Sequence, residues 1–260
     1  MKNYSTILVA DNGLVRTVTL DRPERRNAMT PEMQLELLAA LEHAASSACR
    51  VLVLSGAGDA FCSGLDLTAF EAIHDKTLIE HRADAERIAR LFLALYELPI
   101  PTIAAVHGPA IAGGAGLATI CDFALATQRA KFGFTEVRIG FIPAVVSAFL
   151  ALKIGQRHAI DLLFTGRLID ADEALRIGLV NEVVQPGKLA HRVETLAESL
   201  IANSPRALST TKRLIAAQNK DWLNVAIVAA IDASAEARTT EDFREGLAAF
   251  FAKRKPVWPK

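Results

Sequence analysis

Two short apolar runs constrain the fold more than any other feature of the sequence. "VLVLSG" at 51–56 and "PTIAAVHG" at 101–108 are continuous, contain β-branched residues and end in glycine, and a weaker candidate follows at 121–127. Such runs are typical of strands that are buried on both faces. Residues 77–96, between the first two runs, carry apolar side chains at helical spacing beneath a charged face. This alternation of strand and helix predicts an α/β core.

The chain before the first run predicts a hairpin followed by a helix. "STILVA" and "LVRTVTL" are separated by Asp11-Asn12-Gly13, which is a strong turn signal. Thr30 followed by Pro31 predicts the beginning of a helix that extends to about residue 48.

The last part of the chain has a different character. After about residue 155 the pattern predicts helix upon helix. Ser204-Pro205 marks the beginning of one helix, and Thr239 with Asp242 predicts a capping box for the last one. We therefore expect an α/β core over residues 1–200 and a C-terminal helical domain over 201–260.

Charge and cysteine content exclude several classes of partner. The chain has 29 Lys and Arg and 29 Asp and Glu, so it has no net field to attract nucleic acid. Its cysteines, Cys49, Cys62 and Cys121, are odd in number and widely spaced, which predicts reduced thiols and a cytoplasmic or similarly reducing compartment. No signal-peptide pattern and no apolar segment long enough to cross a bilayer is found, so we expect no membrane association.

Two glycine-containing corners are the first candidates for a functional site. "AIAGGAGLATICD" at 110–122 follows a predicted strand and places the amides of Gly113 and Gly114 near a helix N-terminus, which favours a negatively charged oxygen. "DAFCSGLDL" at 59–67 forms a second corner of this kind at Ser63-Gly64. Two such amides aimed at one oxygen would form an oxyanion hole. Close packing of a helix on a strand is the alternative explanation for these glycines.

Taken together, the motifs resemble the crotonase superfamily, which comprises enoyl-CoA hydratases and isomerases. The resemblance runs nearly from end to end and rests on "LDRPERRNAMT", "AFCSGLDL", "AAVHGPAIAGGAGLATICDFALAT", "KFGFTEVRIGFIPAVVS", "GRLIDADEALRIGLVNEVV" and "FREGLAAFFAKRKPVW". It implies a spiral of β-β-α units that form two near-perpendicular sheets, a C-terminal helical domain and a homotrimer or dimer of trimers. It also implies an acyl-CoA thioester as substrate and no separate cofactor, because coenzyme A is part of the substrate.

The same resemblance assigns roles to individual residues. The backbone amides of Ser63 and Gly113 would bind the thioester oxygen. The other substrate-binding positions that it implies are Gly64, Gly114, Gly116, Phe250 and Lys253. Phe250 and Lys253 fall where family members contact coenzyme A, often across a subunit boundary, although a core aromatic and a solvated lysine explain them equally well.

Glu136, in "FTEVRIG", is the candidate for proton transfer. Its apolar neighbourhood should raise its pKa by desolvation, which suits a general acid and base near neutral pH. An exposed carboxylate, or one paired with Arg138, is the alternative.

Gly116 departs from the common hydratase pattern, because hydratases usually carry a second glutamate at this position. Glycine cannot deprotonate water, and two reactions remain open. An isomerase would need only Glu136 to move a proton along the acyl chain. A branch of hydratases that act on carboxylated esters such as methylglutaconyl-CoA resembles this sequence at the glycine segment and at "EVRIGFIPAVVS", and we favour hydration. A distal carboxylate on the substrate would need a cation, for which Arg82, Arg87 or Arg138 are candidates.

Functions from other classes have weaker sequence support. Ser63, His107 and Asp122 have the composition of a hydrolase triad, but Ser63 lacks the G-x-S-x-G elbow. His74 and His81 are not accompanied by a cluster with metal-ligand spacing, so we expect no metal site. A non-catalytic acyl-CoA-binding protein remains an alternative because of Gly116.

Overall fold

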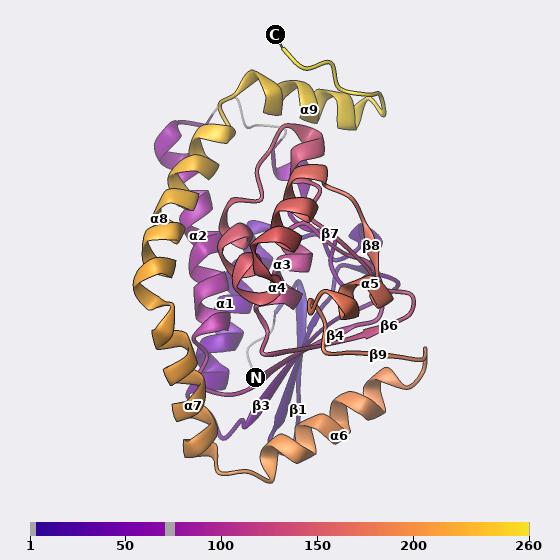
Figure 1. Ribbon diagram of the computed structural model, residues 1–260, viewed down its shortest axis with the longest axis vertical. Helices are drawn as coiled ribbons and strands as arrows, with labels where there is room; N and C mark the ends of the chain where they lie inside the picture. The colour runs from indigo at the N-terminus through magenta and orange to yellow at the C-terminus, as the bar shows by residue number, and fades with distance from the viewer. Residues whose placement is uncertain (1–3, 71–75, 260) are drawn as a thin grey trace.

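Two sheets surrounded by helices form the molecule, as expected for an α/β protein (Figure 1). A computed structural model describes residues 4–70 and 76–259. The six-stranded sheet has the order β1 (Ile7–Asn12), β2 (Val15–Leu20), β3 (Val51–Gly56), β4 (Thr102–Val106), β6 (Phe123–Thr127) and β9 (Glu182–Val184). The three-stranded sheet has the order β5 (Ala110–Ile111), β7 (Lys131–Gly133) and β8 (Ile169–Asp170).

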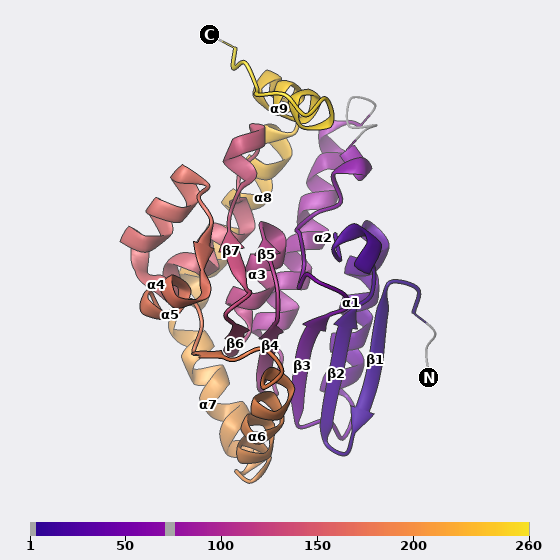
Figure 2. The ribbon, with the colours of Figure 1, turned by 90° about the vertical axis from the view of Figure 1, so that its right-hand side faces the viewer.

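Helices connect and cover these strands. The α-helices are α1 (Pro31–Ala45), α2 (Leu78–Tyr96), α3 (Gly113–Ile120), α4 (Ala144–Thr165), α5 (Ala171–Arg176), α6 (Leu189–Ile201), α7 (Pro205–Gln218), α8 (Lys220–Ala237) and α9 (Glu241–Phe251). Three 3-10 turns complete the description: η1 (Pro23–Arg25), η2 (Leu67–Phe70) and η4 (Glu136–Ile139). Figure 2 shows α6 at one end of the molecule and α9 at the other.

The strands at the centre of the large sheet are buried on both faces, as their sequence predicts. Val51 and Val53 of β3 pack with α6 in one apolar cluster. Leu52 and Leu54, which alternate with them, belong to the main core with α1, α2, α3 and α4. Only the β1 and β2 hairpin is antiparallel in this sheet, and β3, β4, β6 and β9 continue it in parallel.

Most of the predicted helix starts are confirmed by side-chain caps. The Thr30 hydroxyl accepts from the Met33 amide, and Ser204 accepts from the Ala207 amide. The last helix is an exception, because its cap is Thr240 and not Thr239. The third residue of that helix is then Phe243, which has no carboxylate to complete the predicted capping box.

The region after residue 155 is not purely helical, so that expectation is wrong. It contributes β8 to the small sheet and β9 to the edge of the large one. These strands have only 2 and 3 residues, too few to show an alternating pattern in the sequence. Beyond Ile201 the described chain forms α7, α8 and α9 and then an irregular end after Phe251, and α8 packs along α2 and α4 (Figure 1).

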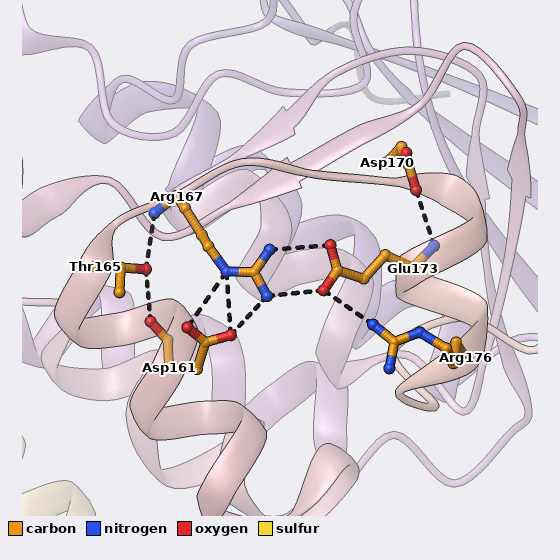
Figure 3. A network of polar contacts seen from close by, with 6 residues as sticks. All are labelled: Asp161, Thr165, Arg167, Asp170, Glu173 and Arg176. Atoms are coloured by element: carbon orange, nitrogen blue, oxygen red, sulfur yellow. Dashed lines mark hydrogen bonds and ion pairs between the residues drawn. The ribbon is translucent and has the colours of Figure 1, made fainter.

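A network of charged side chains joins α4, β8 and α5 at the surface (Figure 3). Arg167 donates to Asp161 at 2.6 Å and to Glu173 at 2.7 Å, and Glu173 also accepts from Arg176 at 3.1 Å. The three side chains around Arg167 are partly exposed, so each pair contributes at most about 1 kcal/mol. The planar guanidinium nevertheless fixes how the two helices meet at the small sheet.

The fold agrees with the expected state of the cysteines. Cys49, Cys62 and Cys121 are all free thiols, and the last two are buried. Within residues 4–70 and 76–259, no helix has the length and apolar character needed to cross a membrane.

Candidate active site

A cavity of about 480 Å³ lies where both glycine corners meet the helical part of the molecule. Its wall includes Ser63 and Leu65 from the first corner, Gly113 from the second, and Glu136 from η4. Side chains of α2, α8 and α9 close it, among them Ile88, Phe92, Ser234, Arg238 and Phe250. The cavity therefore combines the predicted oxyanion corners and the predicted proton-transfer group with an apolar interior.

Backbone conformation at Gly64 sets the first corner. This glycine has φ +93°, a backbone angle that residues with a Cβ rarely adopt. Met29 donates its N–H to the Gly64 carbonyl at 2.7 Å and accepts from the Asp66 amide at 3.0 Å. The Leu65 amide consequently faces away from Met29. Among the described residues, the Leu65 amide has no backbone or side-chain acceptor.

The second corner is the beginning of α3. The Ala112 amide donates to the Gly133 carbonyl at 2.7 Å, and the first helical hydrogen bond runs from the Gly116 amide to the Ala112 carbonyl at 3.0 Å. The amides of residues 113–115 precede that bond and have no partner inside the helix. Ala112 itself has φ +53°, an unusual value for alanine that turns the chain from β5 into the helix.

The two corners touch each other. A Cβ built on Gly64 would lie 2.9 Å from the Ala112 Cβ and 3.4 Å from the Gly113 amide nitrogen. A Cβ on Gly114 would lie 2.2 Å from the Cys62 carbonyl oxygen. Gly64 and Gly114 therefore permit the close approach of the two corners. Neither glycine belongs to the cavity wall.

The predicted role of the Ser63 amide needs correction. This N–H already donates to the Arg26 carbonyl at 3.0 Å, so it cannot donate to a substrate in this conformation. The Leu65 amide, two residues later on the same cavity wall, is the group that remains available. Sequence reasoning missed it because the direction of each amide depends on the positive φ of Gly64.

Glu136 has the environment expected of a proton-transfer group. It begins η4 and lines the cavity, and its Oε2 is buried without a hydrogen-bond partner among the described residues. Burial raises the pKa of Glu136 to about 7, which confirms the predicted direction and cause. Within the described part of the chain no ion pair joins Glu136 to Arg138, whose side chain is exposed, so the alternative pairing is not formed.

Close packing of α9 fixes the turn that carries Glu136. A Cβ on Gly246 of α9 would lie 2.0 Å from the Ile139 carbonyl oxygen. From the other side, Gly140, with φ +66°, approaches the Asp242 backbone, where a Cβ would lie 2.3 Å from the carbonyl oxygen. The last helix of the chain is thus seated directly on η4.

Apolar side chains occupy the space beside Gly116. A Cβ at this position would lie 2.9 Å from Phe92 Cε2 and 3.0 Å from Val146 Cγ2. Phe92 is 1 % exposed and belongs to the main core. The site is therefore built for one glutamate, since a second carboxylate here would have to displace two packed side chains.

A second acidic residue of the cavity wall, Asp66, is in a different state. Its carboxylate accepts from the Arg22 guanidinium at 2.9 Å and from the Thr68 hydroxyl at 2.7 Å. Burial alone would raise the pKa of Asp66, but the bonds from Thr68 and Arg22 outweigh it and hold the pKa below its usual value. Asp66 is thus a structural group that is charged at neutral pH.

The other predicted residues divide between the cavity and the surface. Phe250 lines the cavity, whereas Lys253 is exposed just after α9. The three arginines proposed for a substrate carboxylate do not line it. Arg82 pairs with Glu86 and Asp232, Arg87 with Asp84, and Arg138 is exposed. The cations of the cavity wall are instead Arg25, Arg26 and Arg238.

The hydrolase triad is not assembled. His107 Nε2 bonds the Gly58 carbonyl at 2.9 Å, and Asp122 accepts from the Thr102 amide at 2.8 Å and from Lys212 Nζ at 2.7 Å. The Ser63 hydroxyl bonds the Arg25 carbonyl at 3.4 Å. His74 lies outside the described residues, and within them no group of three or more His, Cys, Asp or Glu side chains could hold a metal ion.

Comparisons with known proteins agree with this geometry. The family model described as "Enoyl-CoA hydratase/isomerase" matches residues 10–260. A Thermus thermophilus protein that carries an enoyl-CoA hydratase name is 44% identical over 247 residues, which cover 95% of this chain and 98% of that protein. A short-chain-enoyl-CoA hydratase of Clostridium acetobutylicum is 33% identical and covers 96% of each chain.

Solved structures extend the agreement to the whole fold. An enoyl-CoA hydratase/isomerase from Xanthobacter autotrophicus superposes with a TM-score of 0.89 at 31% identity, covering 99% of this chain and 100% of that one. An enoyl-CoA hydratase from Mycobacterium avium subsp. paratuberculosis gives 0.88 at 28% identity, with 99% and 100% covered. The chain is therefore an enzyme of the enoyl-CoA hydratase/isomerase family, within the crotonase superfamily.

Proposed function

We propose that the protein is an enoyl-CoA hydratase that works with one carboxylate, and that it acts on branched or carboxylated enoyl thioesters such as methylglutaconyl-CoA. The observation that carries the proposal is the buried carboxyl of Glu136, whose Oε2 has no hydrogen-bond partner among the described residues, in the same cavity wall as the free amides of Leu65 and Gly113. Leu65 replaces Ser63 as the partner of Gly113 in binding the thioester oxygen.

One carboxylate is sufficient for hydration if water and proton add to the same face of the double bond. Ionised Glu136 takes a proton from water while the water oxygen bonds to C3, and the C2–C3 π electrons move to the thioester oxygen. The two amides stabilise that oxyanion, and each such donor typically contributes about 3 kcal/mol to transition-state stabilisation. Protonated Glu136 then delivers its proton to C2, which regenerates the carboxylate.

The beginning of α4 supports a position for the water. Ala144, Val145 and Val146 line the cavity, and this helix has no side-chain cap. Its first internal hydrogen bond runs from the Ser147 amide to the Pro143 carbonyl, so the amides of residues 144–146 have no helical acceptor. These N–H groups can hold the oxygen of a water without a second glutamate.

Isomerisation is the second candidate, and the same single carboxylate favours it. Glu136 would remove a proton from C2 of a 3-enoyl thioester and return it to C4, with the two amides holding the intermediate enolate. The apolar side chains packed beside Gly116 leave no room for the second glutamate that hydratases commonly use.

Product analysis in H₂¹⁸O separates the two reactions. Crotonyl-CoA, a 3-enoyl-CoA and methylglutaconyl-CoA are incubated with the enzyme, and the products are identified by mass spectrometry. We expect ¹⁸O at C3 of the product from at least one 2-enoyl substrate. A shifted double bond without ¹⁸O would replace hydration by isomerisation, and unchanged substrates with bound CoA esters would indicate a non-catalytic protein.

Gly64→Ala tests the oxyanion corners. A methyl group at φ +93° and 2.9 Å from the Ala112 Cβ must separate the two corners, so we expect kcat/KM to fall by about 100-fold or more. Gly187→Ala is the matched control, because Gly187 has φ +84° with open space around its Cβ position. Equal activity of the two variants would remove the corners from the mechanism.

Assembly and binding of coenzyme A complete the proposal. We propose a homotrimer or a dimer of trimers, with residues 201–260 as the oligomerisation domain and Phe250 and Lys253 near the coenzyme A moiety. The support is the exposure of large apolar side chains on this part of the chain, including Trp222, Val225 and Phe250. Sedimentation velocity of the full-length protein measures the subunit number.

A further inference from the structure

A buried asparagine lies beside the first oxyanion corner without belonging to the cavity wall. Asn27 is 0 % exposed and is not one of the residues that line the cavity. A polar side chain is costly to bury unless hydrogen bonds replace its lost hydration. The bonds that Asn27 makes run to the segments that shape the corner.

The side-chain amide of Asn27 joins two parts of the chain that are distant in sequence. Its Nδ2 donates to the Ala57 and Ala60 carbonyls at 2.8 Å each, and it lies 3.2 Å from the Phe61 carbonyl oxygen. Its Oδ1 accepts from the Arg22 amide at 2.9 Å. This one side chain therefore ties the segment that follows β3 to the turn that follows β2.

The backbone at Asn27 decides which amide of the corner is free. Arg26 and Asn27 have φ +50° and +55°, and asparagine tolerates such values better than most residues. With this turn in place, the Arg26 carbonyl accepts from the Ser63 amide at 3.0 Å, and the Asn27 carbonyl accepts from Cys62 Sγ at 3.1 Å. The Ser63 amide is thus occupied, and the Leu65 amide remains for a substrate.

The segment that Asn27 anchors also bonds to the chain that leads into the second corner. Phe61 and Cys62 donate their amides to the Pro109 carbonyl at 3.0 and 3.2 Å, and the Ile111 amide donates to the Cys62 carbonyl at 2.8 Å. A shift of Phe61 would therefore move both corners. Such shifts matter because displacement of a catalytic group by about 1 Å can lower a rate by about 10²-fold.

We propose that Asn27 is a positioning residue for the oxyanion site, in which its side-chain amide holds the first corner so that the Leu65 and Gly113 amides point at one thioester oxygen. The inference rests on the proposed function, which assigns those two amides to that oxygen. Asn27 itself contacts no part of the substrate. Loss of its side chain should therefore weaken binding of the transition state more than binding of a saturated acyl-CoA.

Kinetic and binding measurements on Asn27→Gly test this difference. Glycine keeps the positive φ without strain and removes only the side-chain bonds. We expect kcat to fall by about 10²-fold, while the Kd of butyryl-CoA, measured by titration calorimetry, changes about threefold or less. A loss of affinity for butyryl-CoA as large as the loss of kcat would overturn the inference.

Thr102→Val is the matched control. Thr102 is also 0 % exposed, its hydroxyl bonds Asp122 at 3.0 Å, and it does not line the cavity. This variant also removes a buried polar group, but we expect its kcat to change about twofold or less. Equal losses of kcat in Asn27→Gly and Thr102→Val would overturn the positioning role.

Infrared spectroscopy of a bound thioester measures the polarisation of its carbonyl. Butyryl-CoA labelled with ¹³C at the thioester carbonyl is bound to each protein, and isotope-edited difference spectra give the C=O stretching band. Hydrogen bonds to the carbonyl lower this frequency, so we expect a downshift in the wild type and in Thr102→Val. Asn27→Gly, saturated with the same probe, should lose about half of the downshift or more. An unchanged band in Asn27→Gly would overturn the inference, because a purely structural side chain does not alter carbonyl polarisation.

Asn27→Ser extends the test to the case in which Asn27→Gly does not fold. Its hydroxyl can replace one of the donated bonds, so kcat should fall by about tenfold and part of the downshift should remain. Wild-type values of both quantities in Asn27→Ser would overturn the inference.

The same measurements separate failure of this inference from failure of the proposed function. Hydration of crotonyl-CoA at equal rates by the wild type and Asn27→Gly would reject the positioning role alone. A downshift that depends on Asn27, without hydration of any enoyl thioester by the wild type, would retain the positioning role and reject the hydratase.

Discussion

Glu136 and Asp66 line the same cavity, yet the pKa values of their carboxyl groups are shifted in opposite directions. Burial acts on both, and it would raise the pKa of each. Asp66 has bonds from Arg22 and Thr68 that lower its pKa, whereas Glu136 Oε2 has no partner among the described residues and its pKa rises to about 7. The comparison teaches that the partners of a buried carboxyl, more than its burial, decide whether it can exchange a proton.

Glu136→Gln gives the largest expected effect. Removal of the one group that can exchange a proton should lower kcat by about 10²- to 10⁴-fold, with little change in binding of a saturated acyl-CoA. Asp66→Asn is the matched control and should lower kcat less than tenfold. Stopped-flow absorbance of the enoyl thioester measures both, and equal losses in the two variants would break the comparison.

The same two variants should change stability in opposite directions. The native pKa of Glu136 lies above its unfolded value of 4.5, so the ionised group destabilises the native state once the pH passes through about 7. Glu136→Gln should therefore increase the free energy of unfolding by on the order of 3 kcal/mol at pH 8, relative to its effect at pH 4. Urea unfolding at both pH values measures this gain.

Asp66→Asn should instead lower stability at neutral pH. The native pKa of Asp66 is below 3.8, so its contribution is present above that value and is lost as the pH falls. Loss of a charged hydrogen-bond acceptor should cost about 1–3 kcal/mol at pH 7 and progressively less in acid. Stabilisation by this variant at pH 7 would contradict the role assigned to Arg22 and Thr68.

The pH profile of activity should report Glu136 alone. Because the ionised form takes the proton from water, kcat/KM should rise tenfold per pH unit below about 7 and level off above it. Asp66→Asn should leave the midpoint unchanged. A flat profile between pH 5 and 8 would show that Glu136 titrates outside this range and is not the base.

Thr68→Val gives the smallest expected effect. It removes the 2.7 Å bond from the Thr68 hydroxyl to Asp66 but keeps the Arg22 contact, so unfolding should be easier by about 1 kcal/mol. Activity should change less than twofold. A loss as large as that of Asp66→Asn would show that Thr68, and not Arg22, is the dominant partner.

Local sequence patterns predicted the parts of the fold that depend on local physics. The runs at 51–56 and 101–108 were identifiable because strands buried on both faces must be apolar throughout. The short strands β8 and β9 were missed, since pairing with distant strands stabilises them and their own sequences carry no pattern.

The residues of the candidate site likewise divide into those that local sequence identifies and those that only the folded structure identifies. Glu136 could be found because its neighbours in the sequence are also its neighbours in the cavity. Leu65 could not be distinguished from Ser63, because the positive φ of Gly64 decides which amide is free. Arg238 gave no signal, since only the packing of α8 along α2 brings it to the cavity.

The seating of α9 on η4 has a consequence for how the enzyme acquires activity. Gly246 and Gly140 bring the final helix into contact with the turn that carries Glu136, and Phe250 of that helix reaches the cavity. During synthesis on the ribosome, the sheet and the oxyanion corners can assemble before these last residues emerge. A chain that ends between α8 and α9 should therefore keep a nearly intact core but lose the support of the turn that carries Glu136, and with it catalysis.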